Sequence, residues 1–210
     1  GSLGNERFDY AFAADSGHDY ARLLHAFVIS SDVEGGKSVI IPGIASKWEV
    51  SGDGRTWTLT IRKGAKFHDG TEITTEDVFW TLHHNMGPQA KDYAISSVSL
   101  ARTMEKVEQT GPDRVSLTTK SPNSAFPSRI SAIDGSWRGV VIPKRATLHN
   151  AEEEAAYDKN PVGAGMMKLV KHVPASQMTF ERFADHYHQP KKGFPNDKRP
   201  NFTLLDLRMV

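Results

Sequence analysis

The chain contains no cysteine. This absence excludes disulfides, thiolate zinc sites and cysteine nucleophiles, and it is compatible with either an oxidising or a reducing compartment. The chain also lacks an apolar run of about 18 residues, the minimum for a membrane-spanning helix. No basic segment followed by an apolar run opens the sequence, although Gly1-Ser2 resembles a cloning scar, so a targeting segment could have preceded it.

An excess of charge of one sign is missing as well. Lysine and arginine number 26 against 25 for aspartate and glutamate, and no long block of like charge occurs. Nothing in this balance predicts binding to nucleic acid or to an anionic membrane. With 210 residues, of which 38% are hydrophobic and 24% charged, the chain is long enough for one large globular domain or two small ones.

The segment KFHDGTEITTEDV, residues 66–78, contains a histidine beside an aspartate. The pair could be a general base with its orienting carboxylate, or two metal ligands. The alternative is a turn, in which Asp69 accepts a local hydrogen bond and Gly70 enters the left-handed region, followed by a helix with Thr74 as its N-cap and Asp77 three residues on. We favour the turn, because it accounts for each of these residues except His68, whose imidazole it does not require.

Hydrophobic periodicity predicts a mixed α/β protein. The expected helices cover residues 75–86, with Val78, Phe79, Leu82 and Met86 on the apolar face, and 151–156. Two hairpins are expected, at residues 48–61 and 107–119. Further strands are expected at residues 140–143, 168–173, 177–183 and 202–210.

Two histidine-rich motifs raise the question of a metal site. Adjacent helical residues point about 100° apart, so His83 and His84 cannot both bind one metal. His186 and His188 could share one face of a strand, but no third ligand has a suitable spacing. Nucleophile-elbow, phosphate-loop and zinc-protease motifs are absent from the sequence. We therefore expect that the protein binds no metal or cofactor and is not an enzyme.

Three segments carry a resemblance to a known family. They are IPGIASKWEVSGDGRTWTLTIRKGAKFHDGTEITTEDV, VVIPKRA and NPVGAGMMKLVKHVPASQMTFERFADHYH, and together they cover most of the chain from Ile41 onward. In these segments the chain resembles the extracytoplasmic solute-binding proteins of peptide and nickel ABC importers, which form family 5. The first segment is a long, ordered signature, and the Asn-Pro-Val-Gly motif at residue 160 is an independent second one.

The resemblance implies a periplasmic-binding-protein-like fold of class II, in which two α/β lobes enclose the ligand. It assigns residues 1–35 and 155–210 to the main mixed sheet of the first lobe, and residues 36–154 to an inserted, hairpin-rich α+β subdomain. Family members are considerably longer, so we expect this chain to be the first lobe, with the second lobe absent. Strands that pair with the C-terminal part of the chain in full-length members would here leave an open sheet edge, which favours self-association.

The resemblance also implies function. The protein would be a periplasmic or otherwise extracytoplasmic substrate-binding component that captures a peptide or a similar small solute and delivers it to an ABC permease in the membrane. The resemblance places two loops at the cleft, and either loop could instead be a tight, glycine-dependent connection with no ligand contact. The implied ligand-binding residues are Ser16, Gly17, His18 and Asp19 in the first loop, and Gly165, Met166 and Met167 in the second. Tyr93 and Trp137 are further candidates for ligand contact, and either could instead lie in the core or at the rim.

Two other functions stay open from the residues. The domain could be a protein-interaction module whose partner is the permease or a second copy of the chain. It could also be an enzyme that uses His68 and Asp69 as acid and base. The bound solute is not specified by the sequence, because the second lobe supplies much of the selectivity in this family.

Overall fold

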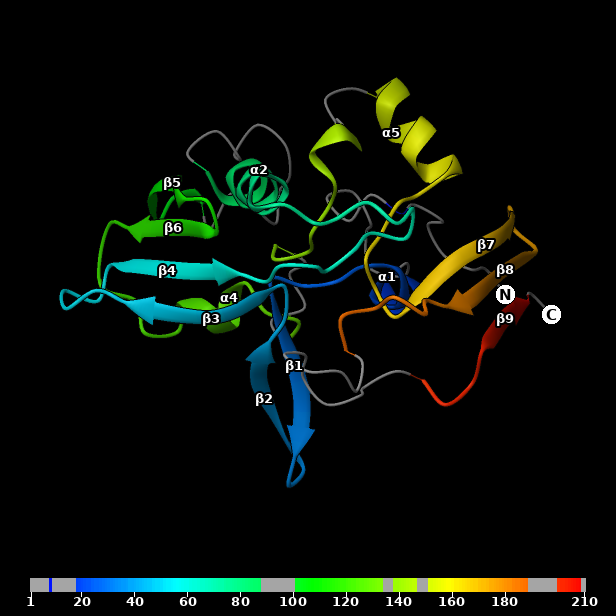
Figure 1. Cartoon of the computed structure of the whole chain (residues 1–210), viewed down its shortest axis with the longest axis horizontal. Coiled ribbons are helices and arrows are strands. Elements are labelled where there is room, and N and C mark those ends of the chain that lie inside the picture. Colours follow the sequence, from blue (N-terminus) through cyan, green and yellow to red (C-terminus); the bar gives the residue numbers. More distant parts are fainter. Residues whose placement is uncertain are drawn as a thin grey trace. The chain divides into compact units, whose positions relative to one another are not determined.

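The computed structural model describes residues 8, 18–87, 101–133, 138–146, 151–188 and 200–208 (Figure 1). The chain divides into two compact units. Unit 1 comprises Gly1–Ala26, Gly64–Glu72 and Arg145–Val210, and unit 2 comprises Phe27–Lys63 and Ile73–Lys144. This division differs from the expected one in placing residues 27–35 in unit 2, and residues 64–72 and 145–154 in unit 1. The assignment of the units to parts of a lobe stays a prediction.

Unit 2 is built on a four-stranded antiparallel sheet with the order β3-β4-β6-β5. Its strands are β3 (Ala45–Val50), β4 (Thr56–Ile61), β5 (Met104–Gly111) and β6 (Arg114–Thr119). Both expected hairpins are therefore confirmed. Every second residue of β4 points inward, and these side chains meet the buried residues of β6; the buried set is Trp57, Leu59, Ile61, Val115 and Leu117.

Helix α2 (Thr75–Met86) packs against β5 and β6. It begins with a complete capping box, because the Thr74 hydroxyl accepts from the Asp77 amide and the Asp77 carboxylate accepts from the Thr74 amide. It ends at Gly87, as expected. Three of the four expected apolar positions are fully buried, but Phe79 is half-exposed and contacts His83. The inner face includes Thr81 and Asn85 instead.

Residues 140–143 do not form the expected strand. Val140 makes one isolated bridge to Phe27, and the next residues have no strand partner. The backbone of Ile142 pairs with a helix side chain, since the Thr81 hydroxyl donates to its carbonyl and accepts from its amide, both at 3.2 Å. Unit 2 also contains a separate hairpin of β1 (Ile29–Glu34) and β2 (Lys37–Pro42), and the short helix α4 (Phe126–Arg129).

Unit 1 contains the three-stranded antiparallel sheet β7-β8-β9. The strands are β7 (Met167–Val173), β8 (Gln177–Arg182) and β9 (Leu204–Arg208), so the three expected strands are confirmed. Met178 and Phe180 of β8 are fully buried. Helix α1 (His18–Leu24) packs against β7, and α5 (Ala151–Lys159) confirms the helix expected from residue 151. The 3₁₀ turn η2 (Lys144–Ala146) spans the last boundary between the units.

Candidate functional site

The His68-Asp69 pair lies in a turn, as expected, within the 64–72 segment of unit 1. The Asp69 carboxylate accepts hydrogen bonds from the Thr71 amide at 3.0 Å and the Thr71 hydroxyl at 2.7 Å. Gly70 has a φ of +87°, which a residue with a side chain adopts only under strain. Arg145 forms an ion pair with Asp69 and lies over the Phe67 ring at 5.4 Å from its centroid.

The turn itself does not use the His68 imidazole, but the expectation that this side chain matters little to the structure is wrong, because its partners lie outside the turn. Its side chain is 5% exposed. Its amide donates to the Gly163 carbonyl at 2.8 Å, and its ring nitrogen Nε2 is 2.9 Å from the Gly165 carbonyl oxygen. The Phe183 ring packs against the imidazole at 4.9 Å between centroids. His68 thus joins the 64–72 segment to the loop formed by residues 163–167.

Two buried histidines of unit 1 are held in the neutral form. Burial lowers the pKa of His68 to about 4, although its hydrogen bond to Gly165 acts in the opposite direction. Burial likewise lowers the pKa of His25 to about 4 against its contact with the Phe8 carbonyl, 2.9 Å from Nε2. For Asp69, burial raises the pKa, but the hydrogen bonds from Thr71 and Arg145 outweigh it and lower the pKa overall. His68 and Asp69 therefore have separate partners, and near neutral pH His68 is uncharged while Asp69 is ionised.

The 163–167 loop contacts the end of α1 without intervening side chains. The Gly165 amide donates to the Leu24 carbonyl at 2.8 Å. A Cβ on Gly163 would lie 1.9 Å from the Leu24 carbonyl oxygen, and one on Gly165 would lie 2.2 Å from that of Leu23. Real Cβ atoms do not approach oxygen so closely, so both positions require glycine. The loop is therefore a tight, glycine-dependent connection, and ligand contact by this loop stays a prediction.

The structure brings together only part of the expected ligand-binding set. Gly165, Met166 and Met167 lie in one loop, where Met166 is half-buried and Met167 is fully buried at the start of β7. Of this pair, Met166 is the side chain that is partly exposed to solvent. His18 and Asp19 begin helix α1. The remaining expected residues, Ser16, Gly17, Tyr93 and Trp137, lie outside the described residues.

The other histidine motifs are used in packing. His84 is buried and stacks on Trp80 with ring centroids 5.0 Å apart. His186 and His188 are also buried, with ring centroids 5.3 Å apart and nearly perpendicular planes. Within the described ranges, no three histidine, aspartate or glutamate side chains lie together as metal ligands would. In the same ranges, no helix combines the length and apolar character needed to cross a membrane.

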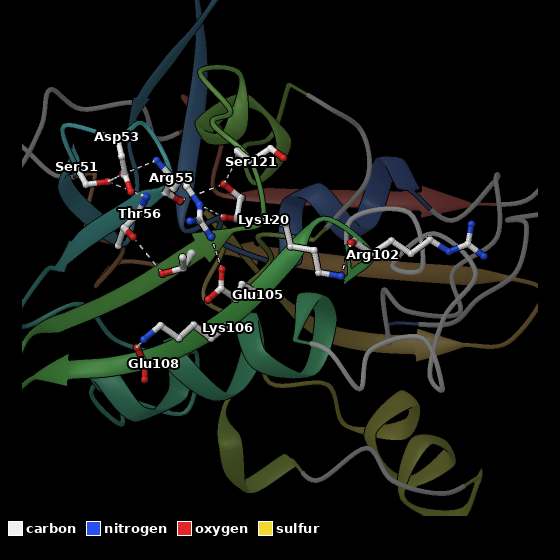
Figure 2. Close-up of polar contacts among 12 residues, drawn as sticks. Ser51, Asp53, Arg55, Thr56, Arg102, Glu105, Lys106, Glu108, Lys120 and Ser121 are labelled. Carbon is white, nitrogen blue, oxygen red and sulfur yellow. Dashed lines mark hydrogen bonds and ion pairs between the residues drawn. The ribbon is translucent and has the colours of Figure 1, made fainter.

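Unit 2 has a polar cluster at the start of β4 (Figure 2). Arg55 donates from Nε to the Thr119 carbonyl at 3.0 Å, and its guanidinium pairs with Glu105. The Arg55 amide donates to the Asp53 carboxylate at 3.0 Å. These contacts tie β4 to β5 and β6, and the charges of Arg55 and Glu105 satisfy each other. We interpret the cluster as a structural connection between strands.

A small apolar pocket of about 280 Å³ lies in the same unit. Its lining residues are Val50, Gly54, Trp57, Pro122, Asn123 and Ser124. None of these side chains is titratable, and the Trp57 indole donates its hydrogen to the Asn123 carbonyl at 3.2 Å. The pocket could accept an apolar group, but it has no acid, base or charge to direct chemistry.

Comparison with known proteins defines the class to which this fold belongs. The chain superimposes over its whole length on the periplasmic binding protein DppA of Helicobacter pylori, solved with the peptide STSA, with a TM-score of 0.79 and 18% identity. The chain covers 41% of that protein. The fold is thus that of a periplasmic binding protein, as the resemblance implied.

The sequence then places the chain within that class. Residues 39–210 match the bacterial extracellular solute-binding proteins, family 5 Middle, and the chain belongs to this family. It is 26% identical over 167 residues to the dipeptide-binding protein of Escherichia coli (strain K12), covering 72% of this chain and 31% of that protein. It is 27% identical over 177 residues to the oligopeptide-binding protein AppA of Bacillus subtilis (strain 168), covering 82% of this chain and 31% of AppA. The chain therefore spans about a third of the length of these curated relatives.

Proposed function

We propose that this chain is part of the first lobe of an extracytoplasmic substrate-binding component of an ABC importer. In this role it captures a peptide or a similar small solute and passes it to a permease in the membrane. The observation that carries the proposal is the family match across residues 39–210, which includes both the His68 turn and the 163–167 loop. Relatives named for dipeptides and oligopeptides favour a peptide as the solute.

The arrangement around His68 favours binding over catalysis. A general base needs a nitrogen that can reach a substrate proton. Here Nε2 donates to the Gly165 carbonyl, the other ring nitrogen Nδ1 is buried, and the Asp69 carboxylate is engaged by Thr71 and Arg145. Neither side chain is therefore free to exchange a proton with a substrate, and we do not assign this site an acid-base role.

A single lobe should bind weakly. A two-lobed receptor gains affinity by enclosing the ligand from both sides and excluding water. If the complete receptor binds at about micromolar strength, near −8 kcal/mol, retaining about half of that free energy leaves a dissociation constant near millimolar. We therefore expect no calorimetric signal from this chain with peptides at micromolar concentration, whereas the complete receptor should give one.

A more sensitive test uses methionine methyl groups labelled with ¹³C. The partly exposed Met166 should shift when a tripeptide, Ala-Ala-Ala, is added at about millimolar concentration, near the expected dissociation constant. Met104 and Met178, which are 1% and 0% exposed, serve as internal references that should stay unchanged. A Met166→Leu variant identifies the signal, and glucose is the control solute. Equal shifts of all methyl groups, or an unmoved Met166, would contradict a peptide site at this loop.

A further inference from the structure

The 163–167 loop is held from two sides by groups far away in the sequence. On one side, His68 supplies both a backbone and a side-chain donor, to the carbonyls of Gly163 and Gly165. On the other side, the Leu24 carbonyl accepts the Gly165 amide. Because both glycines already lie against the backbone of residues 23 and 24, the loop cannot move further in that direction. The His68 side is the one from which it can be released.

The proton on His68 has one possible location in this arrangement. A carbonyl oxygen can only accept, so Nε2 carries the hydrogen and Nδ1 is bare. Nδ1 is buried and has no hydrogen-bond partner among the described residues. A second proton, on Nδ1, would therefore introduce a buried positive charge without a partner.

The charged groups near His68 offer little compensation. Lys168 on β7 disfavours a positive charge there, His25 after α1 is itself neutral and supplies no negative charge, and Asp69 favours it only weakly. Asp69 is already paired with Arg145. From the 183–188 segment, the group packed on the imidazole is the Phe183 ring, and the Asp185 carboxylate is paired with Lys66 at 2.8 Å. Protonation should consequently favour any state in which His68 leaves this position.

We propose that His68 is the positioning residue of the 163–167 loop: its singly protonated imidazole holds the loop beside α1, and a second proton releases it. The inference rests on the proposed function in treating this loop as part of the ligand site. It adds a specific residue and protonation state on which the shape of that site depends.

The test is hydrogen exchange of the Gly165 amide in the whole chain, followed by NMR and corrected for the intrinsic pH dependence of exchange. His68→Gln is the main variant, because its side-chain amide can still donate to the Gly165 carbonyl but does not titrate. If a released His68 has its ordinary pKa, lowering the pH from 7 to 5 should favour release about twentyfold. The protection of Gly165 in the native chain, relative to His68→Gln, should fall by a similar factor.

A second variant tests the hydrogen bond itself. His68→Phe keeps an aromatic ring at this position but has no hydrogen-bond donor. The Gly165 amide should therefore lose protection by about tenfold at pH 7, which corresponds to the free energy of one buried hydrogen bond. His83→Gln on α2 is the control and should match the native chain at both pH values. A native-to-His68→Gln ratio that changes less than about tenfold between pH 7 and pH 5 overturns the proposal. If His68→Phe does not fold, the change in the native-to-His68→Gln protection ratio between pH 7 and pH 5 is by itself the test of the proposal.

The peptide titration separates this inference from the proposed function. If exchange follows the predicted pattern but Met166 ignores Ala-Ala-Ala in both the native chain and His68→Gln, the loop is positioned by His68 and the peptide site is wrong. If Met166 responds to the peptide but the exchange ratio stays constant, the peptide site stands and the role of His68 is wrong.

Discussion

At the scale of single residues, predictions from the sequence succeed where the interaction is local. Asp69 is two residues from its partner Thr71, and Thr74 is three from Asp77. The role of His68 could not be found in this way, because its partner Gly165 is 97 residues away. Neither the turn nor the helix pattern carries a signal for that contact.

Replacement of His68 by alanine should lower stability substantially, contrary to the small effect expected from the turn alone. The change removes a buried ring that packs on Phe183 and one hydrogen bond, which together suggest a loss of about 2–4 kcal/mol. Urea unfolding at pH 7 measures the loss. His83→Ala is the matched control. An equal loss of stability in the two variants would show that the contacts of His68 contribute no more than those of a histidine on the helix surface.

Gly163→Ala should be more damaging than its size suggests. The new methyl group would lie 1.9 Å from the Leu24 carbonyl oxygen, so α1 or the loop must move. We expect a loss of about 2 kcal/mol or more, within the range of strained core substitutions. Gly52→Ala is the control, because no atom lies within 4 Å of its Cβ position. Thermal unfolding of the two variants compares them, and similar melting temperatures would contradict the contact.

At the scale of elements, alternation and helical spacing located the hairpins, the strands of unit 1 and helix α2. These patterns are reliable when one face is buried and the other is solvated. Residues 140–143 carry no such pattern, being apolar throughout, and a short apolar run fits several structures. The Thr81 hydroxyl supplies the hydrogen bonds that a neighbouring strand would otherwise provide to Ile142.

The capping box of α2 gives a graded prediction. Thr74→Ala should cost about 1 kcal/mol, as the loss of an N-cap usually does. Asp77→Ala should cost more, because the Asp77 carboxylate also accepts from the Lys144 amide at 2.8 Å. Glu76→Ala removes only an exposed ion pair with Lys144 and should cost less than about 1 kcal/mol. Chemical denaturation gives the three values, and an effect of Glu76→Ala as large as that of Asp77→Ala would contradict this ranking.

At the scale of the whole molecule, the motifs indicated the family, and the family match confirms it. The boundaries of the two units were not predictable from local patterns. The 64–72 segment belongs to unit 1 although the chain on both sides of it belongs to unit 2. Its membership depends on contacts with residues near 145, 163 and 183, which become visible only in three dimensions.

Stability should decrease in mild acid. The folded chain lowers the pKa of His25 and of His68 to about 4, below the value of about 6.5 for an unfolded histidine. The unfolded chain therefore binds more protons than the folded chain between these values, and stability falls as the pH falls from about 6.5 towards 4. Each histidine contributes up to about 3 kcal/mol. Urea titrations at pH 7, 6 and 5 measure the trend, which should be shallower in His68→Gln. A constant free energy of unfolding across this range would contradict it.

The interleaving of the units has a consequence for the order of events during synthesis. All of unit 2 precedes residue 145, whereas unit 1 needs the residues after it. At a synthesis rate of about 5–20 residues per second, roughly 5–20 s separate the appearance of His68 from that of Gly165. Unit 2 can therefore fold before the later residues of unit 1 are synthesised. At that stage Ala65 and Phe67, which are fully buried in the folded protein, lack the residues that cover them. In a cell, we expect a chaperone that recognises apolar segments to bind the nascent chain at these two residues.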